Sequence, residues 1–281
     1  MLSEHPTRIY PRPFLKWAGG KSRLIKQYAD YLPDRSKYRN YYEPFLGGGA
    51  VFFHLQPHKA ILSDVNPDLV ATYCCVKNNL EELICKLKEH DIYHCPDYYY
   101  HVRANPGSNQ VDIAARLIYL NKTCFNGLYR VNSKGEFNVP LGKYENPKIC
   151  QVDALLSASK ALQNAEIRQN DFEKILDLAL SSNDFVYLDP PYHPISNTSD
   201  FTAYSTVPFK ECDQIRLRDV CAILANRGVK VMISNSDCQL IREIYSDINF
   251  NIYQIKASRA INSNIKRRGA IYELLITSYR N

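Results

Sequence analysis

One stretch of the sequence constrains the fold more than any other: an apolar run at residues 185–188 (Phe-Val-Tyr-Leu), followed at once by residues 189–192 (Asp-Pro-Pro-Tyr). A strand without polar positions must be covered on both faces, which is typical of parallel sheets flanked by helices. The two prolines cannot continue the sheet, so the chain leaves it there in a fixed, extended shape. The sequence therefore predicts an open α/β sheet with a site at the carboxyl end of this strand.

Helical and strand patterns alternate elsewhere along the chain. Apolar spacing predicts helices over residues 22–32, 80–121 and 213–225, and short apolar runs predict strands over residues 41–43, 60–63, 229–233 and 271–277. Asn66 is expected to cap a helix that begins at Pro67. Residues 125–144 are polar and rich in glycine, with a hairpin tip predicted at residues 132–135. We therefore expect one α/β domain, residues 1–67 and 152–281, and an inserted domain, residues 68–151, of helices plus a hairpin.

The composition narrows the class of protein. The 35 Lys and Arg residues outnumber the 29 Asp and Glu residues, which gives a formal net charge of +6 and permits a polyanionic partner without requiring one. Nine cysteines, an odd number, in a chain of 281 residues with no recognisable secretory segment favour reduced thiols in a cytoplasm. No stretch approaches the roughly 20 apolar residues that span a bilayer. No Cys-x-x-Cys pair occurs, so no metal is expected.

The tetrapeptide Asp189-Pro190-Pro191-Tyr192 suits chemistry at an aromatic amine. Such an amine is a poor nucleophile because its lone pair is delocalised into the ring. A carboxylate and a backbone carbonyl that accept its hydrogens favour the pyramidal, attacking form, and fixed acceptors of this kind stabilise the transition state. Tyr192 is expected to stack on the base. A Pro-Pro turn after a core strand is the structural alternative.

Two further segments are candidates for ligand binding. Residues 43–49 (Glu-Pro-Phe-Leu-Gly-Gly-Gly) follow a predicted strand, and their glycines allow a ligand to approach the backbone near a helix N-terminus. Asp64 ends the next strand, where an acid commonly accepts hydrogen bonds from ribose hydroxyls. A tight turn at the glycines and a capping role for Asp64 are the structural alternatives.

Residues 14–21 (Phe-Leu-Lys-Trp-Ala-Gly-Gly-Lys) form the other candidate segment. It holds Trp17, the only tryptophan of the chain, beside two glycines and two lysines. Trp17 either anchors the terminal segment in the core or lies with Lys21 against a bound ligand.

Together these segments resemble the Dam-type family of DNA adenine methyltransferases, over nearly the whole chain from residue 14 to residue 279. In that family the cofactor loop precedes the catalytic tetrapeptide, and a target-recognition insertion lies between them. The resemblance also rests on four shorter motifs, residues 63–66 (Ser-Asp-Val-Asn), 125–130 (Phe-Asn-Gly-Leu-Tyr-Arg), 135–140 (Gly-Glu-Phe-Asn-Val-Pro) and 234–236 (Ser-Asn-Ser). It implies a Rossmann-like fold that binds S-adenosylmethionine and needs no metal.

The resemblance also implies roles for single residues. Asp189, Pro190 and Tyr192 would be catalytic, and S-adenosylmethionine would be bound by Trp17, Lys21, Glu43, Phe45, Gly47, Gly49, Asp64 and Asp189. The DNA-binding positions would be Lys16, Phe125, Asn126, Leu128, Arg130 and Pro140. Phe125 stands where the best-known members have a tyrosine, so it keeps the stacking surface and lacks the hydroxyl. An arginine such as Arg130 suits the O6 and N7 acceptors of guanine.

A basic cluster near the C-terminus, Lys256, Arg259, Lys266, Arg267 and Arg268, is interleaved with serines and asparagines. Contact with DNA phosphates and a merely solvated loop explain it equally well.

Other enzyme classes fit the residues less well. A cytosine-C5 methyltransferase uses a Pro-Cys nucleophile, and none of the nine cysteines follows a proline. The ligands of a zinc-dependent deaminase do not occur. Cytosine-N4 and protein-glutamine methyltransferases usually begin the tetrapeptide with Ser or Asn rather than Asp189. A DNA-binding regulator without catalysis would not need the intact tetrapeptide.

We therefore expect a site-specific adenine-N6 methyltransferase that flips its target adenine out of double-stranded DNA, in GATC, without a covalent enzyme–base intermediate. We expect it to act as a monomer in the cytoplasm, associated with the nucleoid and not with a membrane. Functional pairing with a restriction endonuclease is consistent with this prediction.

Overall fold

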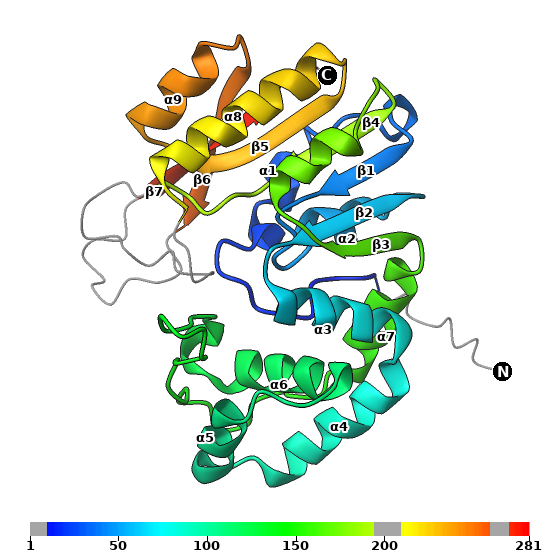
Figure 1. The fold of residues 1–281 in the computed structure, drawn as a ribbon, viewed down its shortest axis with the longest axis vertical. Coiled ribbons are helices and arrows are strands. Elements are labelled where there is room, and N and C mark those ends of the chain that lie inside the picture. The colour runs from blue at the N-terminus through cyan, green and yellow to red at the C-terminus, as the bar shows by residue number, and fades with distance from the viewer. Residues whose placement is uncertain (1–9, 194–208, 259–269, 281) are drawn as a thin grey trace, which may run out of the picture.

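The computed structural model describes residues 10–193, 209–258 and 270–280 (Figure 1). Within these residues, seven strands form one sheet in the order β3-β2-β1-β4-β5-β7-β6. Strands β1 to β5 pair in parallel, whereas β7 runs antiparallel to both β5 and β6. The strands are β1 (Asn40–Glu43), β2 (Ala60–Asp64), β3 (Ala165–Gln169), β4 (Asp184–Leu188), β5 (Lys230–Ser236), β6 (Asn251–Ser258) and β7 (Ala270–Thr277). The predicted α/β fold is confirmed.

The strand order places a topological switch point between β1 and β4. From β1 the chain continues outward to β2 and β3, and from β4 it continues in the opposite direction to β5. In open α/β sheets, ligands bind outside the carboxyl ends of the strands at this point. The glycine-rich segment follows β1 and the Asp-Pro-Pro-Tyr segment follows β4, so both flank the switch point.

Strand β4 is buried along its whole length, as its apolar sequence predicts. Successive side chains of a strand point to opposite faces of the sheet. Phe185 and Tyr187 accordingly join the core on one face, and Val186 and Leu188 join the core on the other. The sheet therefore has a hydrophobic core on each side.

Helices cover both faces of the sheet (Figure 1). Helices α2, α3 and α7 contribute to the core that contains Phe185, and α8 and α9 to the core that contains Val186. The helices are α1 (Ile25–Tyr28), α2 (Ala50–Leu55), α3 (Pro67–Asn78), α4 (Leu80–Tyr93), α5 (Pro96–Ala104), α6 (Gln110–Thr123), α7 (Val152–Leu162), α8 (Glu211–Asn226) and α9 (Gln239–Ser246). Short 3₁₀ turns lie at Lys21–Arg23, Arg35–Lys37, Phe125–Gly127 and Phe172–Asp177.

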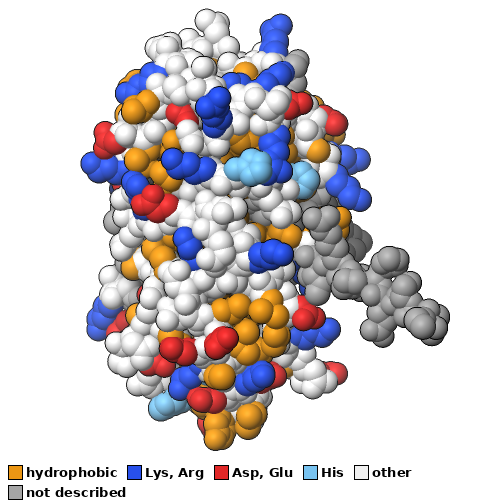
Figure 2. Space-filling model, turned by 90° about the vertical axis from the view of Figure 1, so that its right-hand side faces the viewer, with side chains coloured by type: hydrophobic (Ala, Val, Ile, Leu, Met, Phe, Trp, Pro, Cys, Tyr) orange, Lys and Arg blue, Asp and Glu red, His pale blue; other side chains and the backbone are white. Residues whose placement is uncertain are grey.

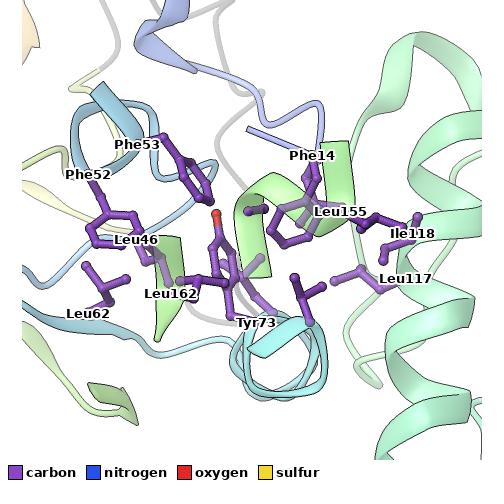
Figure 3. Packing of buried hydrophobic residues seen from close by; sticks show 14 of the residues in the cluster. Phe14, Leu46, Phe52, Phe53, Leu62, Tyr73, Leu117, Ile118, Leu155 and Leu162 are labelled. Carbon is purple, nitrogen blue, oxygen red and sulfur yellow. The ribbon is translucent and has the colours of Figure 1, made fainter. Parts of the chain in front are cut away.

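The core beside α3 continues from the sheet into the inserted helices. Tyr73 of α3 is fully buried and lies between Phe53 of the sheet-covering helix α2 and Leu117 of α6 (Figure 3). Helix α3 begins as the sequence predicts, since the Asn66 side chain accepts a hydrogen bond from the amide of Leu69 (3.1 Å). The apolar packing is therefore continuous from α2 through α3 to α6.

The helix predicted over residues 22–32 is wrong in its extent. Its apolar face is correct, because Leu24, Tyr28 and Leu32 are buried. Regular α-helix covers only Ile25–Tyr28, preceded by a 3₁₀ turn at Lys21–Arg23. The 3₁₀ turn that precedes the helix carries Lys21, whose side chain is buried.

The helical pattern over residues 80–121 divides into the three helices α4, α5 and α6. Pro96 starts α5, where a missing amide hydrogen costs nothing. Gly107 adopts a positive φ of 77° in the following turn, and Asn109 caps α6 by accepting a hydrogen bond from Asp112 (2.9 Å). Proline and glycine thus break what apolar spacing alone reads as one segment.

The predicted hairpin at residues 125–144 forms its tip but no regular strands. The amide of Gly135 donates to the carbonyl of Asn132 (2.9 Å), which closes the turn. Pairing is otherwise limited to two antiparallel bridges, Cys124 with Leu141 and Val131 with Phe137. The segment is therefore a looped hairpin without a continuous ladder, and its apolar residues, such as Phe137 and Val139, pack into the neighbouring core.

The described surface carries mixed charge. On the face shown in Figure 2, lysine and arginine side chains are interspersed with acidic ones, and hydrophobic side chains gather in its lower half. That face is therefore not uniformly basic. In the described part of the chain, no helix combines the length and the apolar character that crossing a membrane requires.

A buried histidine among the inserted helices predicts acid-sensitive stability. His90 is 6% exposed and stacks on Tyr119 with ring centroids 4.8 Å apart, while its Nδ1 lies 2.9 Å from the Tyr98 hydroxyl. Burial, and then the charge of Lys86, lowers the pKa of His90 to about 4. Because the unfolded chain takes up the proton at higher pH than the native state, stability falls as the pH drops from about 6.5 towards 4.

We expect the loss to be on the order of 2 kcal/mol and to be smaller in His90→Gln. Urea unfolding at several pH values measures it, with His54→Gln, at an exposed position on α2, as the matched control. Parallel pH dependence of wild type and His90→Gln would show that His90 does not carry the effect.

Candidate active site

Four acidic residues lie near the carboxyl ends of the central parallel strands. Glu43 ends β1, Asp64 ends β2 and Asp189 directly follows β4. Because β7 is antiparallel, its early residue Glu273 pairs with Ser236 at the end of β5 and reaches the same edge. The sequence predicts the first three of these positions, whereas Glu273 was not among the predicted site residues.

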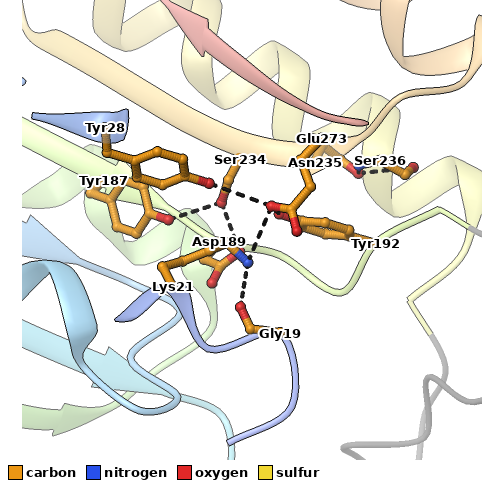
Figure 4. Close-up of polar contacts among 10 residues, drawn as sticks. All are labelled: Gly19, Lys21, Tyr28, Tyr187, Asp189, Tyr192, Ser234, Asn235, Ser236 and Glu273. Carbon is orange, nitrogen blue, oxygen red and sulfur yellow. Dashed lines mark hydrogen bonds and ion pairs between the residues drawn. The ribbon is translucent and has the colours of Figure 1, made fainter. Parts of the chain in front are cut away.

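Asp189 is held by two donors. Its Oδ1 accepts a hydrogen bond from the Ser234 hydroxyl (2.7 Å) and lies 2.9 Å from the Nζ of Lys21 (Figure 4). The Tyr187 hydroxyl lies 2.9 Å from that of Ser234 and completes the chain of contacts. A charge-assisted hydrogen bond is stronger than a neutral one, so the carboxylate is fixed in one orientation.

Lys21 is a buried cation, with a side chain that is 2% exposed. Its Nζ donates to the carbonyl of Gly19 and pairs with Asp189. It also lies 4.6 Å from the centre of the Tyr192 ring and 3.9 Å from Oε2 of Glu273. A buried ammonium requires such partners, so Lys21 couples the N-terminal segment to the end of β4.

Tyr192 is anchored at both its ring and its hydroxyl. The hydroxyl donates to Oε2 of Glu273 (2.7 Å), and the ring lies over the ammonium of Lys21. Burial, with the nearby Tyr28 and the charge of Asp189, raises the pKa of Tyr192 well above its usual value. The phenol is therefore neutral at physiological pH and acts as a hydrogen-bond donor.

The backbone of the Pro-Pro-Tyr segment is held from β5 and α8. Gln214, which is fully buried, donates to the carbonyl of Pro191 (2.9 Å) and accepts from the side-chain Nδ2 of Asn235 (2.9 Å). The Ser236 hydroxyl donates to the carbonyl of His193 (2.8 Å). Sequence reasoning missed Gln214, although a glutamine on the buried face of an amphipathic helix is a signal that could have found it.

The glycine-rich turn is built around Asp64. Its two carboxylate oxygens accept hydrogen bonds from the amides of Gly47 (3.1 Å) and Asn66 (3.0 Å), and burial raises its pKa. Gly47 has a positive φ of 46°, and a Cβ there would lie 2.8 Å from the Trp17 ring. Glycine is therefore required at this position by conformation and by close packing.

Glu43 and Phe45 contact neighbouring residues of the protein itself. The Oε2 of Glu43 accepts from the Tyr41 hydroxyl (2.7 Å) and from the amide of Phe52 in the first turn of α2 (3.2 Å). Burial raises the pKa of Glu43 to about 8, and the charge of Asp189 contributes to the rise. Phe45 stacks on Phe172 with ring centroids 5.4 Å apart. Gly49, with φ 64°, is the N-cap of α2.

The N-terminal segment joins this site to the looped hairpin. Trp17 stacks on Tyr129 with ring centroids 5.4 Å apart. Asn121 of α6 accepts from the amide of Lys16 (2.8 Å) and donates to its carbonyl (2.6 Å). At Gly127 a Cβ would lie 2.8 Å from Cδ of Lys16, so glycine permits this close approach. The ammonium of Lys16 lies over the ring of Tyr144 (4.7 Å).

The other residues expected to bind DNA lie on the same looped hairpin. The amide of Phe125 donates to the carbonyl of Pro140 (2.9 Å), while the Phe125 side chain is 50% exposed. Asn126 adopts a positive φ of 56°, which asparagine tolerates better than most residues. Leu128 packs against the core. The exposed Arg130 donates from Nε to Oδ1 of Asn138 (2.7 Å), which orients its guanidinium.

Of the basic cluster near the C-terminus, only Lys256 lies among the described residues, where its carbonyl accepts from Gln27 (3.0 Å). Arg259, Lys266, Arg267 and Arg268 lie outside them. Within the described residues, no group of three histidine, cysteine or acidic side chains is arranged to hold a metal ion, and the nine cysteines are unpaired.

This sheet, with the Asp-Pro-Pro-Tyr segment at its switch point, has the architecture of a Rossmann-like methyltransferase. Comparison with known proteins gives the family: the model of the D12 class N6 adenine-specific DNA methyltransferases matches residues 17–261. The chain belongs to this family. It is an adenine-specific DNA methyltransferase, and DNA is its substrate.

Named relatives match over nearly their whole length. The type II methyltransferase M1.LlaDCHI of Lactococcus lactis subsp. cremoris is 43% identical, with 98% of each chain covered. The type II methyltransferase M.MjaIII of Methanocaldococcus jannaschii is 44% identical, with 95% of this chain and 99% of the relative covered. The DNA adenine methylase of Escherichia coli K12 is 37% identical, with 94% of each covered.

Proposed function

We propose that the chain transfers a methyl group from S-adenosylmethionine to the N6 amine of an adenine flipped out of duplex DNA. The single observation that carries this proposal is the Asp189 carboxylate, held by Ser234 and Lys21 beside the ring of Tyr192. An acceptor and an aromatic face lie together there, as an extrahelical aromatic amine requires.

The residues around the glycine-rich turn fit S-adenosylmethionine. Asp64 presents a carboxylate whose orientation two backbone amides fix, which suits ribose hydroxyls. Trp17 and Phe45 add aromatic surface. The positive φ angles of Gly47 and Gly49 turn the backbone at the carboxyl edge of the sheet, where a ligand can approach it. When bound, the cofactor would supply a methyl group activated by an adjacent sulfonium. Lys21 and Glu43 complete the proposed set of binding residues.

In the proposed reaction, Asp189 and the carbonyl of Pro190 accept the hydrogens of the adenine amine. The carboxylate charge and the carbonyl dipole would favour the pyramidal nitrogen, whose lone pair would form the new N–C bond as the C–S bond of the cofactor breaks. The surplus proton of the methylated nitrogen would pass to solvent. Tyr192 stacks on the base and replaces the stacking that it loses on leaving the duplex. No covalent bond between enzyme and base is required.

We further propose that residues 68–151 form the target-recognition domain and read GATC. Lys16, Asn126, Leu128, Arg130 and Pro140 would contact the site, and Phe125 would enter the duplex near the flipped base. Support comes from the exposed Phe125 ring and from the hydrogen bonds that bring Lys16 onto the same surface. Action as a monomer and pairing with a restriction endonuclease are part of the same proposal.

Arg130→Ala should cost roughly 1–3 kcal/mol on the cognate site and much less on duplexes altered at the guanine it reads. Its Nε and Nη2 donate to Oδ1 and the carbonyl oxygen of Asn138 (2.7 and 3.4 Å), so the edge formed by Nη1 and Nη2 is the one that would make a bidentate contact with guanine. Methylation of a duplex panel in which every GATC position is varied measures the effect. Lys134→Ala, at the exposed tip of the same hairpin, is the control.

The panel separates three outcomes. A wild type that prefers another sequence removes the GATC proposal and leaves the adenine chemistry intact. Equal loss by Arg130→Ala on every duplex would make Arg130 a phosphate-binding or structural residue. Loss confined to duplexes that keep one particular guanine supports its reading role.

A further inference from the structure

Glu273 is the one acidic residue in strand β7, between apolar neighbours. Its side chain is only 19% exposed, and a carboxylate in such a strand requires hydrogen bonds or counter-charge. Its Oε2 accepts from the hydroxyls of Tyr192 (2.7 Å) and Tyr28 (3.5 Å). Two phenols from distant parts of the chain thus hold one carboxylate oxygen in place.

That oxygen faces the ammonium of Lys21. The Nζ of Lys21 lies 2.9 Å from Oδ1 of Asp189 and 3.9 Å from Oε2 of Glu273, so one cation lies between two carboxylates (Figure 4). It pairs more closely with Asp189. A shift of about 1 Å would transfer the ion pair to Glu273, a distance within the range of ordinary side-chain motion.

The pairing has a consequence for substrate binding. Oδ1 of Asp189 accepts from Ser234 and Lys21, so an amine that binds this oxygen competes with Lys21 for it. A buried ammonium that loses its anion without a replacement is strongly destabilised. Glu273 supplies the replacement, because its Oε2 lies 3.9 Å from the Nζ of Lys21.

We propose that Glu273 is a positioning residue that receives the ammonium of Lys21 when Asp189 accepts the adenine amine. Tyr28 and Tyr192 orient the Glu273 carboxylate through their hydroxyls. The inference rests on the proposed function, since it assumes that Asp189 binds the amine. In this proposal Glu273 affects the reaction through the charge that it presents to Lys21, and it does not contact the base.

The charge and the hydrogen bonds of Glu273 can be separated by substitution. Glu273→Gln keeps an oxygen that accepts from the two phenols and removes the negative charge. We expect the single-turnover rate of methyl transfer to fall about tenfold, with affinities for duplex and S-adenosylmethionine changed less than about threefold. Glu273→Asp retains the charge and should recover part of the rate. Glu166→Gln, an exposed acid on β3 of the same sheet, is the matched control.

A binding measurement tests the same step without turnover. Affinities are measured for two duplexes, one with adenine at the target position and one in which purine, which lacks the amine, replaces that adenine. The quantity compared is the ratio of the first affinity to the second. Comparing this ratio between wild type and Glu273→Gln cancels the pairing energy of the duplex itself. We expect the preference for adenine to fall several-fold in Glu273→Gln, because Lys21 remains on Asp189.

Either of two results overturns the proposal. In the first, Glu273→Gln matches wild type in both rate and adenine preference. In the second, it weakens binding of both duplexes equally with an unchanged rate, which assigns Glu273 a structural role. Thermal melts verify that each variant is folded, and Glu273→Asp provides the test if Glu273→Gln does not fold. Failure of the proposed function is distinguishable, since wild type itself would then not methylate adenine.

Discussion

Replacing Asp189 with alanine should reduce methyl transfer at least a hundredfold, while duplex binding persists. The carboxylate is the acceptor that activates the amine in the proposed reaction, and loss of one fixed stabilising partner typically costs on the order of a hundredfold or more. The substitution also takes from Lys21 its closest anion, at 2.9 Å, and leaves Glu273 at 3.9 Å. Radiolabelled methyl transfer to duplex DNA, with binding measured separately, gives the result.

Asp189→Asn and Asp247→Ala serve as the companion variants. The asparagine keeps the shape of the side chain and lacks the charge, so it should lose nearly as much activity as alanine. Asp247 is an exposed carboxylate after α9, and its removal should leave the rate unchanged. Near-normal turnover by a folded Asp189→Ala protein is incompatible with the proposed role of the carboxylate.

Tyr192→Ala should have the second-largest effect, and Tyr192→Phe and Tyr192→Trp should be much milder. Stacking on an aromatic ring is worth about 1–3 kcal/mol per base, which corresponds to roughly 5- to 150-fold in rate or affinity. The hydroxyl of Tyr192 contacts Glu273, so Phe loses one hydrogen bond and keeps the ring. Single-turnover rates of the three variants make the comparison.

Tyr187→Phe is the natural control for the loss of a phenol near Asp189. Its hydroxyl reaches Asp189 only through Ser234 (2.9 Å), and its ring is buried in the sheet. It should retain most of the activity. If Ala, Phe and Trp at position 192 behaved alike, stacking would not be the function of the ring, and the contact with Glu273 would be the better explanation.

The parts of the fold that the sequence predicts are those with strong local patterns. The run at residues 185–188 has no polar position, and it forms the fully buried β4. Strand β3 was missed because its sequence, Ala-Glu-Ile-Arg-Gln, is largely polar and the strand lies at the edge of the sheet. Strand β6 lies at the other edge and was missed as well. Edge strands bury little, so their sequences carry a weak signal.

The candidate site likewise contains residues that a local sequence pattern predicts and residues that it does not. The Asp-Pro-Pro-Tyr segment and Asp64 are recognisable because each lies at the carboxyl end of an apolar strand. Glu273 lies 81 residues from Tyr192 in sequence, and the antiparallel register of β7 brings the two together. Gln214 likewise reaches Pro191 only through the packing of α8 on the sheet. No local pattern encodes such contacts, because they depend on the tertiary arrangement.

The most direct test of the central claim is the identity of the modified base. The chain should be expressed in a host without adenine methylation, and its DNA should be digested to nucleosides, analysed by mass spectrometry and sequenced for modified positions. The account predicts N6-methyladenine at one short motif in cells with the wild-type chain and none in cells with Asp189→Ala. N4-methylcytosine in its place, or no modified base in the presence of folded wild-type protein, would contradict it.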